Sequence, residues 1–325
     1  MRAIQITAYG EPREVLHVVD LPEPAEPGNG EVLVGVEFSP LNFHDLNLVK
    51  GLLPKRPPLP LVPGNEGVAR VLRAGPDVTD LAPGDRIALP LLSGAWRERL
   101  VISTVGLSPL PDADAKQLSM IVGNPPTASL ALSEYAPLGP GDWIVQNSAN
   151  GGVGRSLIAI AKRRGIKTAN IVRRADAVAE LVALGADVVV VNGPDTAREI
   201  RQRIGADTPL PVAVDSIGGD AADPLLELLS PGGTLVFYSN ATGKPVDIDG
   251  PVARSKNLTA TKLFVGAFDR QTTLLPLIEE AAAMVASGEI NTPIEAVYPL
   301  AEISSALDHL YRGGKILLEI DPAGS

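Results

Sequence analysis

The first 118 residues alternate short hydrophobic runs with turn-forming residues. Signals such as Gly75-Pro76 and Ala82-Pro83-Gly84-Asp85 separate the runs, and five prolines fall between residues 52 and 64. Runs of this length between turn signals are typical of β-strands, and a proline-rich stretch is kept out of regular structure. The pattern therefore predicts a mostly β, barrel-like region. Its strands are expected at residues 2–7, 31–38, 67–74, 86–89 and 97–102.

The hydrophobic pattern changes period at about residue 119. Short, continuously apolar segments now alternate with segments of helical spacing. Continuously apolar strands are buried on both faces, and strands that alternate with helices form βαβ units, so the pattern predicts a parallel, doubly wound sheet. Strands are expected at residues 143–146, 168–172, 188–191, 212–215 and 234–238, and helices at 129–135, 154–164, 175–184, 196–204 and 221–229.

The segment after Lys262 holds too few elements for an independent fold. We expect its elements to return to the β-rich region and complete it. The predicted fold class is α/β, with a β-rich domain of residues 1–118 and 266–325 and a doubly wound domain of residues 119–265. The expected elements of the last segment are helices at 272–287 and 301–311 and strands at 296–299 and 315–320.

Composition limits the partners and cofactors of the chain. Its 38 acidic and 28 basic residues give a net charge of −10, which argues against a nucleic acid or an anionic membrane as partner. There is no cysteine, and His17, His44 and His309 lack a metal-binding spacing, so we expect no metal site. No apolar run reaches 18 residues, and the N-terminus lacks an apolar core of signal-peptide length, so a cytoplasmic location is expected.

A glycine-rich turn lies between the strand at 143–146 and the helix that follows. Its residues, Ala149-Asn150-Gly151-Gly152-Val153-Gly154, form a G-x-G-x-x-G pattern with alanine in the first place. Gly151 lets the main chain approach a pyrophosphate, Gly154 lets the helix pack on the strand, and the amides that open the helix favour negative charge. The pattern alone is weak, because glycine-rich loops are common. Its place at the head of repeated βαβ units predicts a dinucleotide site.

The end of the next predicted strand indicates which dinucleotide binds. A site for NAD places Asp or Glu there to hold the ribose 2′-hydroxyl, whereas a 2′-phosphate requires arginine. This strand ends on Arg173 and Arg174, and Asp176 follows in the first turn of a helix, where it matches the helix dipole. Arginine binds phosphate through several donors at once. NADPH is therefore the expected cofactor; the alternative is a solvated basic pair at the start of a helix.

Five segments carry a resemblance between essentially the whole chain and the medium-chain dehydrogenase/reductase superfamily. The lead-in Gln146-Asn147-Ser148-Ala149-Asn150 is similar to that of the 2-enoyl thioester reductase branch (mitochondrial-type enoyl-ACP and enoyl-CoA reductases). So is Gly64-Asn65-Glu66-Gly67, where zinc alcohol dehydrogenases of the superfamily carry a metal-binding histidine. The five segments are Leu41-Asn42-x-x-Asp45-x-Asn47 and residues 63–68, 94–97, 124–128 and 146–154.

The resemblance implies a GroES-like catalytic domain beside a Rossmann domain, and zinc-free hydride transfer to the β-carbon of a carbonyl-conjugated double bond. It implies that Asn42 lies in the catalytic cleft, with Asn124 and Thr127 near the nicotinamide. Both of the latter could instead cap the helix that follows, since Asn and Thr are favoured there. The cofactor-binding residues that it implies are Asn147, Ala149, Asn150, Gly151, Gly152, Val153, Gly154, Arg173, Arg174, Tyr238, Asn240 and Lys315.

The loop before Gly64 departs from the family pattern. Thioester reductases of this branch carry there a tyrosine that donates a proton or stabilises the enolate, and the equivalent position here is Leu53. No tyrosine lies between Tyr9 and Tyr135. His44 is a candidate to replace it, because histidine suits proton transfer at neutral pH; the alternative is a structural hydrogen bond.

Three functions are consistent with these residues. The leading hypothesis is an NADPH-dependent reductase of carbonyl-conjugated C=C bonds, with an enoyl thioester or enone as its small-molecule substrate. The second is an NADPH:quinone oxidoreductase, which needs no positioned tyrosine because water protonates quinone oxygens readily. The third is a non-catalytic NADPH-binding sensor. Relatives commonly dimerise by joining nucleotide-domain sheets, and the apolar segment 258–268 is the candidate edge strand for a homodimer.

Overall fold

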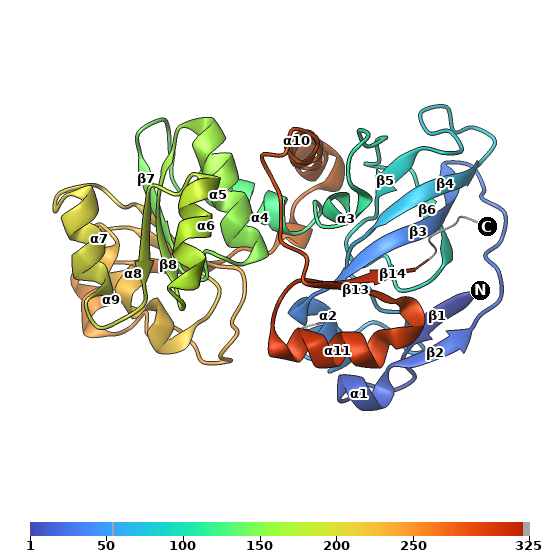
Figure 1. Cartoon of the computed structure of the whole chain (residues 1–325), viewed down its shortest axis with the longest axis horizontal. Coiled ribbons are helices and arrows are strands. Elements are labelled where there is room, and N and C mark those ends of the chain that lie inside the picture. The colour runs from blue at the N-terminus through green and yellow to red at the C-terminus, as the bar shows by residue number, and fades with distance from the viewer. Residues whose placement is uncertain (54, 321–325) are drawn as a thin grey trace. The chain divides into compact units, whose positions relative to one another are not determined.

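A computed structural model describes residues 1–53 and 55–320 and separates the chain into two units (Figure 1). Unit 1 consists of Met1–Gly123 and Asp269–Ser325, and unit 2 of Asn124–Phe268. The domains expected from the sequence were 1–118 with 266–325, and 119–265. Pro54 in the proline-rich loop and residues 321–325 of the expected first domain lie outside the described residues.

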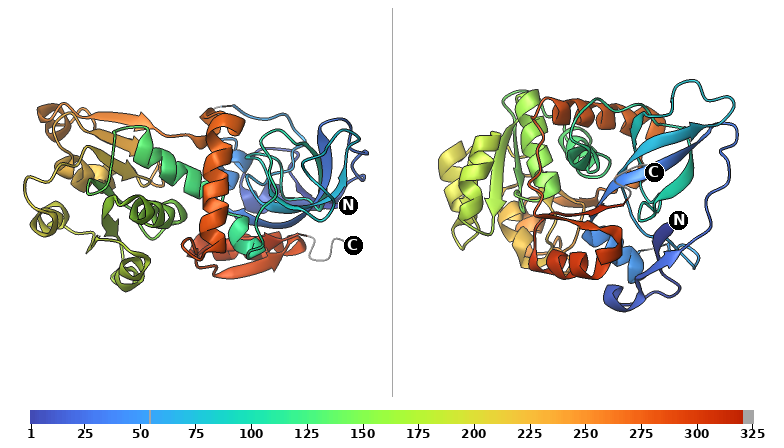
Figure 2. Two further views of the ribbon diagram at one scale, coloured as in Figure 1. Left: turned by 90° about the horizontal axis from the view of Figure 1, so that it is seen from above. Right: turned by 45° about the vertical axis from the view of Figure 1, so that its right-hand side comes forward.

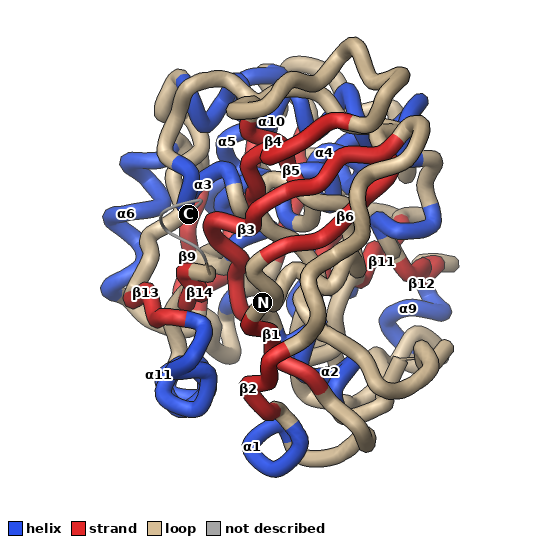
Figure 3. The backbone as a smooth tube through the Cα atoms, turned by 90° about the vertical axis from the view of Figure 1, so that its right-hand side faces the viewer, coloured by secondary structure: helices blue, strands red, loops and turns tan. Residues whose placement is uncertain are grey.

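Unit 1 is built around one long strand, β3 (Glu31–Leu41). It pairs antiparallel with three others, and Figure 3 shows it between β4 and β6. Because β14 comes from the C-terminal end of the chain and lies directly beside β3, the two halves of unit 1 share one sheet. In spatial order the sheet contains β13 (Ala296–Pro299), β14 (Ile316–Glu319), β3, β4 (Val68–Ala74) and β5 (Arg86–Ala88), with β6 (Arg99–Ser103) also on β3.

Apolar side chains from both halves of unit 1 pack together in a shared core. Ile4, Val34, Trp96, Leu307 and Ile316 are each at most 1% exposed and belong to one cluster. Burying a side chain of this size stabilises a fold by about 1.5–3 kcal/mol. The other elements of unit 1 are β1 (Arg2–Gln5), α1 (Pro12–Val15), β2 (His17–Asp20), α2 (Phe43–Val49), α3 (Ala115–Leu118), α10 (Leu275–Ala286), η4 (Leu300–Glu302) and α11 (Ile303–Arg312).

Unit 2 contains a six-stranded sheet in which all neighbouring strands are parallel. The order β9-β8-β7-β10-β11-β12 is that of a Rossmann sheet, in which the ligand site forms where the order reverses, here between β7 and β10. The strands are β7 (Trp143–Gln146), β8 (Lys167–Val172), β9 (Val188–Val191), β10 (Val212–Asp215), β11 (Thr234–Phe237) and β12 (Thr259–Lys262). The prediction of a doubly wound parallel sheet is confirmed.

Helices cover both faces of this sheet, as the views in Figures 1 and 2 show. The two central strands are apolar except for the last residue of each, and Ile144, Val145 and Val214 are at most 1% exposed, because each face of the sheet is packed against helices. The helices are α4 (Asn124–Ser133), α5 (Gly152–Arg164), α6 (Asp176–Leu184), α7 (Thr196–Ile204), η1 (Gly219–Ala222), α8 (Asp223–Leu228), α9 (Pro251–Ser255) and η2 (Val265–Ala267).

Proline explains why two of the predicted helices begin differently from expectation. The helix expected at 129–135 begins earlier, at Asn124, because Pro125 and Pro126 are tolerated in a first turn whose amides need no intrahelical partner. The helix expected at 272–287 begins with a wider turn, η3 (Arg270–Leu274), before α10. Pro276 has no amide hydrogen to continue a regular helix into that turn.

Candidate active site and cofactor site

The glycine turn of unit 2 joins the end of β7 to the start of α5. Gly151 is the N-cap of α5, and the first amides of a helix have no intrahelical carbonyl partner. A Cβ atom on Gly154 would lie 2.5 Å from the carbonyl oxygen of Ala149, so only glycine allows the helix this close to the strand. The turn therefore presents backbone N–H groups at the positive end of a helix dipole, which suits an anionic pyrophosphate.

Asn124 lies directly against this turn. A Cβ atom on Gly152 would come within 2.4 Å of Asn124 Nδ2, so the amide of Asn124 and the backbone of the turn are in contact. Asn124 and Thr127 both lie inside α4, and Thr127 is 6% exposed. The N-cap role considered for them is therefore not what the structure shows.

Polar residues gather at the carboxyl ends of β7, β10 and β11. Asn147 is 3% exposed; its Nδ2 donates to Asp215 Oδ1 at 2.5 Å, and its Oδ1 accepts from the N–H of Ser216 at 3.0 Å. These bonds hold the ends of β7 and β10 together at the reversal of strand order. Burial raises the pKa of Tyr238 to about 12, so its phenol is neutral. Asn240 is exposed, and its Oδ1 accepts from Thr242 at 3.2 Å.

Arg173 and Arg174 follow β8, the strand next to β7. Both are exposed, and Arg174 Nε pairs with Asp176 at 3.2 Å. Because β7 and β8 are parallel neighbours, the arginines lie at the same sheet edge as the glycine turn. This edge therefore offers backbone amides and guanidinium groups to one anionic ligand.

A second polar cluster forms in unit 1 from Asn42, Asp45, Glu66 and Lys315. Lys315 Nζ donates to Asn42 Oδ1 at 2.8 Å, and Asn42 Nδ2 donates to Glu66 Oε1 at 3.0 Å. The antiparallel pairing of β14 with β3 sets Ile316 opposite Leu41, which brings Lys315 beside Asn42. The amide of Asn42 thus bridges an ammonium and a carboxylate.

Backbone amides hold the two carboxylates of this cluster in place. Asn42 and Asp45 form a capping box at the start of α2, in which Asp45 Oδ2 accepts from the N–H of Asn42 at 2.8 Å. Asp45 Oδ1 accepts from the N–H of Asn65 at 2.7 Å, and Glu66 Oε2 accepts from the N–H of Gly123 at 3.0 Å. Asp45 therefore links α2 to the loop of residues 64–67. Glu66 links the same loop to Gly123, the last residue of the first segment of unit 1.

Burial dominates the electrostatics of the cluster. Asp45 is 2% and Glu66 1% exposed. Burial raises the pKa of Asp45 from 3.8 to about 7, against the lowering effect of its two backbone hydrogen bonds. Burial also raises the pKa of Glu66, whereas the Lys315 charge opposes that rise, and burial lowers the pKa of Lys315. The Lys315 charge therefore supports the charges of Asp45 and Glu66, whereas the Glu66 charge opposes the ionisation of Asp45.

The buried Asp45 is expected to make stability depend on pH. Its folded-state pKa is about 7 and its ordinary value 3.8, so between these values the folded chain holds a proton that the unfolded chain has released. The contribution of Asp45 to the free energy of unfolding therefore falls as pH rises from 4 to 7, by up to about 4 kcal/mol. Denaturant unfolding of wild type and Asp45→Asn at several pH values measures this contribution. The free energy of unfolding of wild type relative to the variant should fall between pH 4 and 7. A difference that does not change with pH would contradict the raised pKa of Asp45.

His44 and Leu53 lie in the same unit. His44 is partly exposed in the first turn of α2, immediately before Asp45, and Phe43 beside it is 61% exposed. Leu53 packs against the apolar core of unit 1. The position at which the resemblance leads us to expect a tyrosine therefore holds a partly buried apolar side chain with no hydroxyl.

Two family models match the chain. An alcohol dehydrogenase GroES-like domain matches residues 28–112 in unit 1, and a zinc-binding dehydrogenase domain matches residues 152–280. The mitochondrial enoyl-acyl-carrier-protein reductase of Rattus norvegicus is 32% identical over 323 residues, which is 95% of this chain and 85% of the relative. The chain belongs to the medium-chain dehydrogenase/reductase superfamily, in its 2-enoyl thioester reductase branch.

Solved structures of this superfamily share the fold. The complex of Etr1p with NADP and crotonyl-CoA has a TM-score of 0.87 at 24% identity, covering 98% of this chain and 99% of that one. A protein from Bacillus thuringiensis assigned as an NADPH:quinone reductase also has a TM-score of 0.87 at 24% identity, covering 98% of both chains. At this identity the likeness shows the fold alone, and the fold accommodates both kinds of named reductase.

The resemblance matches Asn65 to the position where zinc-dependent members of the superfamily carry a histidine. Here its N–H donates to Asp45. Within residues 1–53 and 55–320, no three His, Asp or Glu side chains are grouped so that they could hold a metal ion. In the same part of the chain, no helix has both the length and the apolar character needed to cross a membrane.

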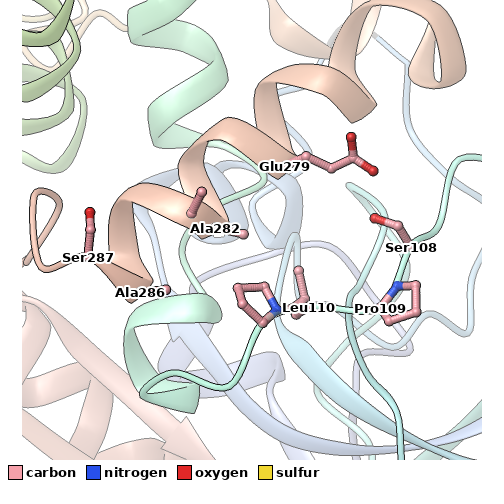
Figure 4. Close-up of a pocket in the computed structure, with 9 residues that line it drawn as sticks. Ser108, Pro109, Leu110, Glu279, Ala282, Ala286 and Ser287 are labelled. Atoms are coloured by element: carbon pink, nitrogen blue, oxygen red, sulfur yellow. The ribbon is translucent and has the colours of Figure 1, made fainter.

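A hollow in unit 1 lies between the loop at 108–111 and α10 (Figure 4). Its walls are mostly proline, leucine and alanine, with Glu279 at one side. None of the predicted site residues lines it, so it is separate from both polar clusters. The labelled lining residues are Ser108, Pro109, Leu110, Glu279, Ala282, Ala286 and Ser287.

Sequence reasoning placed Asn42 in the catalytic cleft and Lys315 near the cofactor but did not connect them. Glu66 and Asp45 were noted only as members of the segments that carry the family resemblance. The available signal was the carboxylate of Glu66 in the segment Gly64-Asn65-Glu66-Gly67-Val68. A carboxylate beside glycine and apolar residues is rarely buried without a partner. The partners themselves lie far away in sequence.

Proposed function

We propose that this protein is a zinc-free, NADPH-dependent reductase of carbonyl-conjugated C=C bonds, with an enoyl thioester as its reference substrate. The observation that carries the proposal is the 32% identity with an enoyl-acyl-carrier-protein reductase along 95% of the chain. The absence of cysteine and the asparagine at the histidine position support the zinc-free part. When bound, NADPH supplies the hydride; the protein positions the reactants and polarises the carbonyl.

The cofactor is assigned to the carboxyl edge of the unit 2 sheet. The backbone of the glycine turn would bind the pyrophosphate, and Arg173 and Arg174 the 2′-phosphate. Asn147 would contribute to the shape of the site from the ends of β7 and β10. Tyr238 and Asn240 would lie beside the nicotinamide. The turn residues in this assignment are Ala149, Asn150, Gly151, Gly152, Val153 and Gly154. Lys315, which the resemblance also places near the cofactor, donates to Asn42 in unit 1, and we assign it to that amide instead.

Removal of both arginines is expected to abolish the preference for NADPH. Each guanidinium–phosphate bond is worth about 1.5–3 kcal/mol, so Arg173→Ala/Arg174→Ala should raise the Kd for NADPH by about 100-fold and leave that for NADH nearly unchanged. Fluorescence titration with both cofactors measures the ratio. Arg198→Ala, which breaks an exposed pair with Asp195, serves as the control. An equal loss for the two cofactors would place the arginines away from the 2′-phosphate.

We assign roles in the reaction to four residues. Asn42 and His44 would contact the substrate, and Asn124 with Thr127 would lie at the nicotinamide. We assign proton donation to His44, because Leu53 offers no hydroxyl and histidine titrates near neutral pH. A His44→Ala variant that reduces crotonyl-CoA at the wild-type rate would remove His44 from the mechanism.

A panel of three acceptors tests the proposed function. NADPH oxidation is followed by absorbance with crotonyl-CoA, a simple enone and a quinone. Turnover of crotonyl-CoA is the expected result. Turnover of the quinone alone would favour the second candidate, an NADPH:quinone oxidoreductase. Leu53 is consistent with that candidate, because quinone reduction needs no positioned acid from the protein. Tight NADPH binding without any turnover would instead support a non-catalytic sensor.

A homodimer and a cytoplasmic location complete the proposal. β12 is the last strand of the unit 2 sheet, within the apolar segment 258–268, and Phe264 just beyond it is 44% exposed. An edge strand of this kind is suited to pairing with a second copy. Light scattering at several concentrations tests the dimer, with Thr261→Pro expected to yield monomers. The curated relative is named as mitochondrial, so cell fractionation tests the location.

A further inference from the structure

We propose that the side-chain amide of Asn42 donates a hydrogen bond to the carbonyl oxygen of the substrate, and that Lys315 and Glu66 orient it for this task. The inference rests on the proposed function and adds to it the group that polarises the carbonyl. Asn42 acts as a catalytic residue, whereas Lys315 and Glu66 are positioning residues that act through it.

The charges on either side of Asn42 determine which way its amide points. Its Oδ1 accepts from the Lys315 ammonium at 2.8 Å, and its Nδ2 donates to Glu66 Oε1 at 3.0 Å. Rotating the amide by half a turn would set its oxygen against a carboxylate and its NH₂ group against an ammonium. Because both contacts would then be repulsive, one orientation is strongly favoured.

The oriented amide retains one donor. An asparagine amide has two N–H groups, and Glu66 accepts from one of them. Within residues 1–53 and 55–320, the second has no protein acceptor, and Asn42 is partly exposed, so a ligand can reach it. The ammonium on Oδ1 draws electron density from the amide, which strengthens Nδ2 as a donor.

The cluster is also rigid. A hydrogen-bond donor must be held rigidly if it is to stabilise a charge that develops during the reaction. Glu66 is 1% exposed and accepts from the N–H of Gly123, and Asp45 holds the N–H of Asn42 and of Asn65. Asn42 is therefore held through both its main chain and its side chain. A donor fixed in advance needs no reorganisation when charge appears on the substrate.

Such a donor has a clear role in the proposed reaction. Arrival of the hydride forms a C–H bond at the β-carbon and moves the π electrons onto the carbonyl, which gives an enolate with negative charge on oxygen. Asn42 stabilises that oxygen. A proton from water, directly or through His44, then forms the C–H bond at the α-carbon and restores the carbonyl.

The first test is kinetic. Asn42→Ala should lower kcat for crotonyl-CoA by about 100-fold, since one oxyanion donor contributes that much, while the Kd for NADPH stays within about two-fold of wild type. Asn29→Ala, an exposed asparagine of unit 1, is the matched control and should keep full activity. Thermal melting of each variant checks that it is folded.

The second test separates positioning from cofactor binding. Lys315→Met should lower kcat by about 10-fold, and Lys315→Arg should recover part of the loss because it retains the charge. In the double variant Asn42→Ala/Lys315→Met, the loss should be no larger than in Asn42→Ala alone, because Lys315 acts only through Asn42. Additive losses, or a raised Kd for NADPH as the main effect of Lys315→Met, would overturn the inference.

The third test needs no cofactor. Difference infrared spectra of crotonyl-CoA labelled with ¹³C at the thioester carbonyl, bound without NADPH, should show a lowered carbonyl frequency in wild type and a smaller shift in Asn42→Ala. Equal shifts would overturn the inference. The proposed function fails separately, if wild type does not reduce crotonyl-CoA; the inference alone fails if wild type reduces it and Asn42→Ala does so equally well.

Discussion

Gly154→Ala is expected to raise the Kd for NADPH by at least about 100-fold and to lower the free energy of unfolding by about 1–3 kcal/mol. The added methyl carbon would lie 2.5 Å from the carbonyl oxygen of Ala149 and 2.7 Å from its carbonyl carbon and Cα. All three are backbone atoms, so relief requires the start of α5 to move away from the end of β7. That movement would displace the amides to which we assign the pyrophosphate.

Isothermal titration with NADPH and denaturant unfolding measure the two effects of Gly154→Ala. Gly193→Ala is a matched control in the same unit, because a Cβ atom there would meet no atom within 4 Å. It should bind NADPH as wild type does. If Gly154→Ala also binds NADPH normally, the glycine turn is not the pyrophosphate site.

Loss of the Glu66 carboxylate is expected to destabilise the protein by about 3–5 kcal/mol. Glu66→Ala removes a side chain that is 1% exposed and that accepts hydrogen bonds from the N–H of Gly123 and from Asn42 Nδ2. It also removes the opposite charge that supports the Lys315 ammonium, whose pKa burial already lowers. Removing one partner of a buried charge pair lowers the free energy of unfolding by more than the intact pair contributes to it, because the other charge remains uncompensated.

A double-variant cycle identifies the cause of the Glu66 effect. Glu66→Gln/Lys315→Met removes both charges and keeps an acceptor at Glu66, so it should be more stable than Lys315→Met alone. Denaturant unfolding at neutral pH provides the four free energies. If the single losses simply add in the double variant, the two charges do not interact and Glu66 contributes only hydrogen bonds.

Sequence patterns predicted the elements of unit 2 closely because each pattern reports a local environment. β7 was expected at 143–146 and is Trp143–Gln146, since a strand covered on both faces reads as a continuous apolar run. α2 (Phe43–Val49) was missed because seven residues are too few for a helical period to stand out. Its capping box between Asn42 and Asp45 was the signal that could have revealed it.

Both candidate sites were predicted in part. The glycine turn and the paired arginines are contiguous in sequence, so their chemistry is visible in the residues themselves. The cluster of unit 1 is not contiguous. Its Glu66 is 24 residues from Asn42, and its Lys315 is 273 residues away, so the pattern around each residue carries no information about the others.

The sequence by itself therefore determined the doubly wound sheet, the family of the chain, the glycine turn and the arginine pair behind it, because these depend on local period and local chemistry. Only the tertiary structure decided that Lys315, Asn42 and Glu66 form one bonded group. The physical reason is the antiparallel register of β14 on β3, which sets Ile316 opposite Leu41. This pairing brings together two segments that are separated by most of the chain. That register follows from burial of the unit 1 core, which all of its strands share.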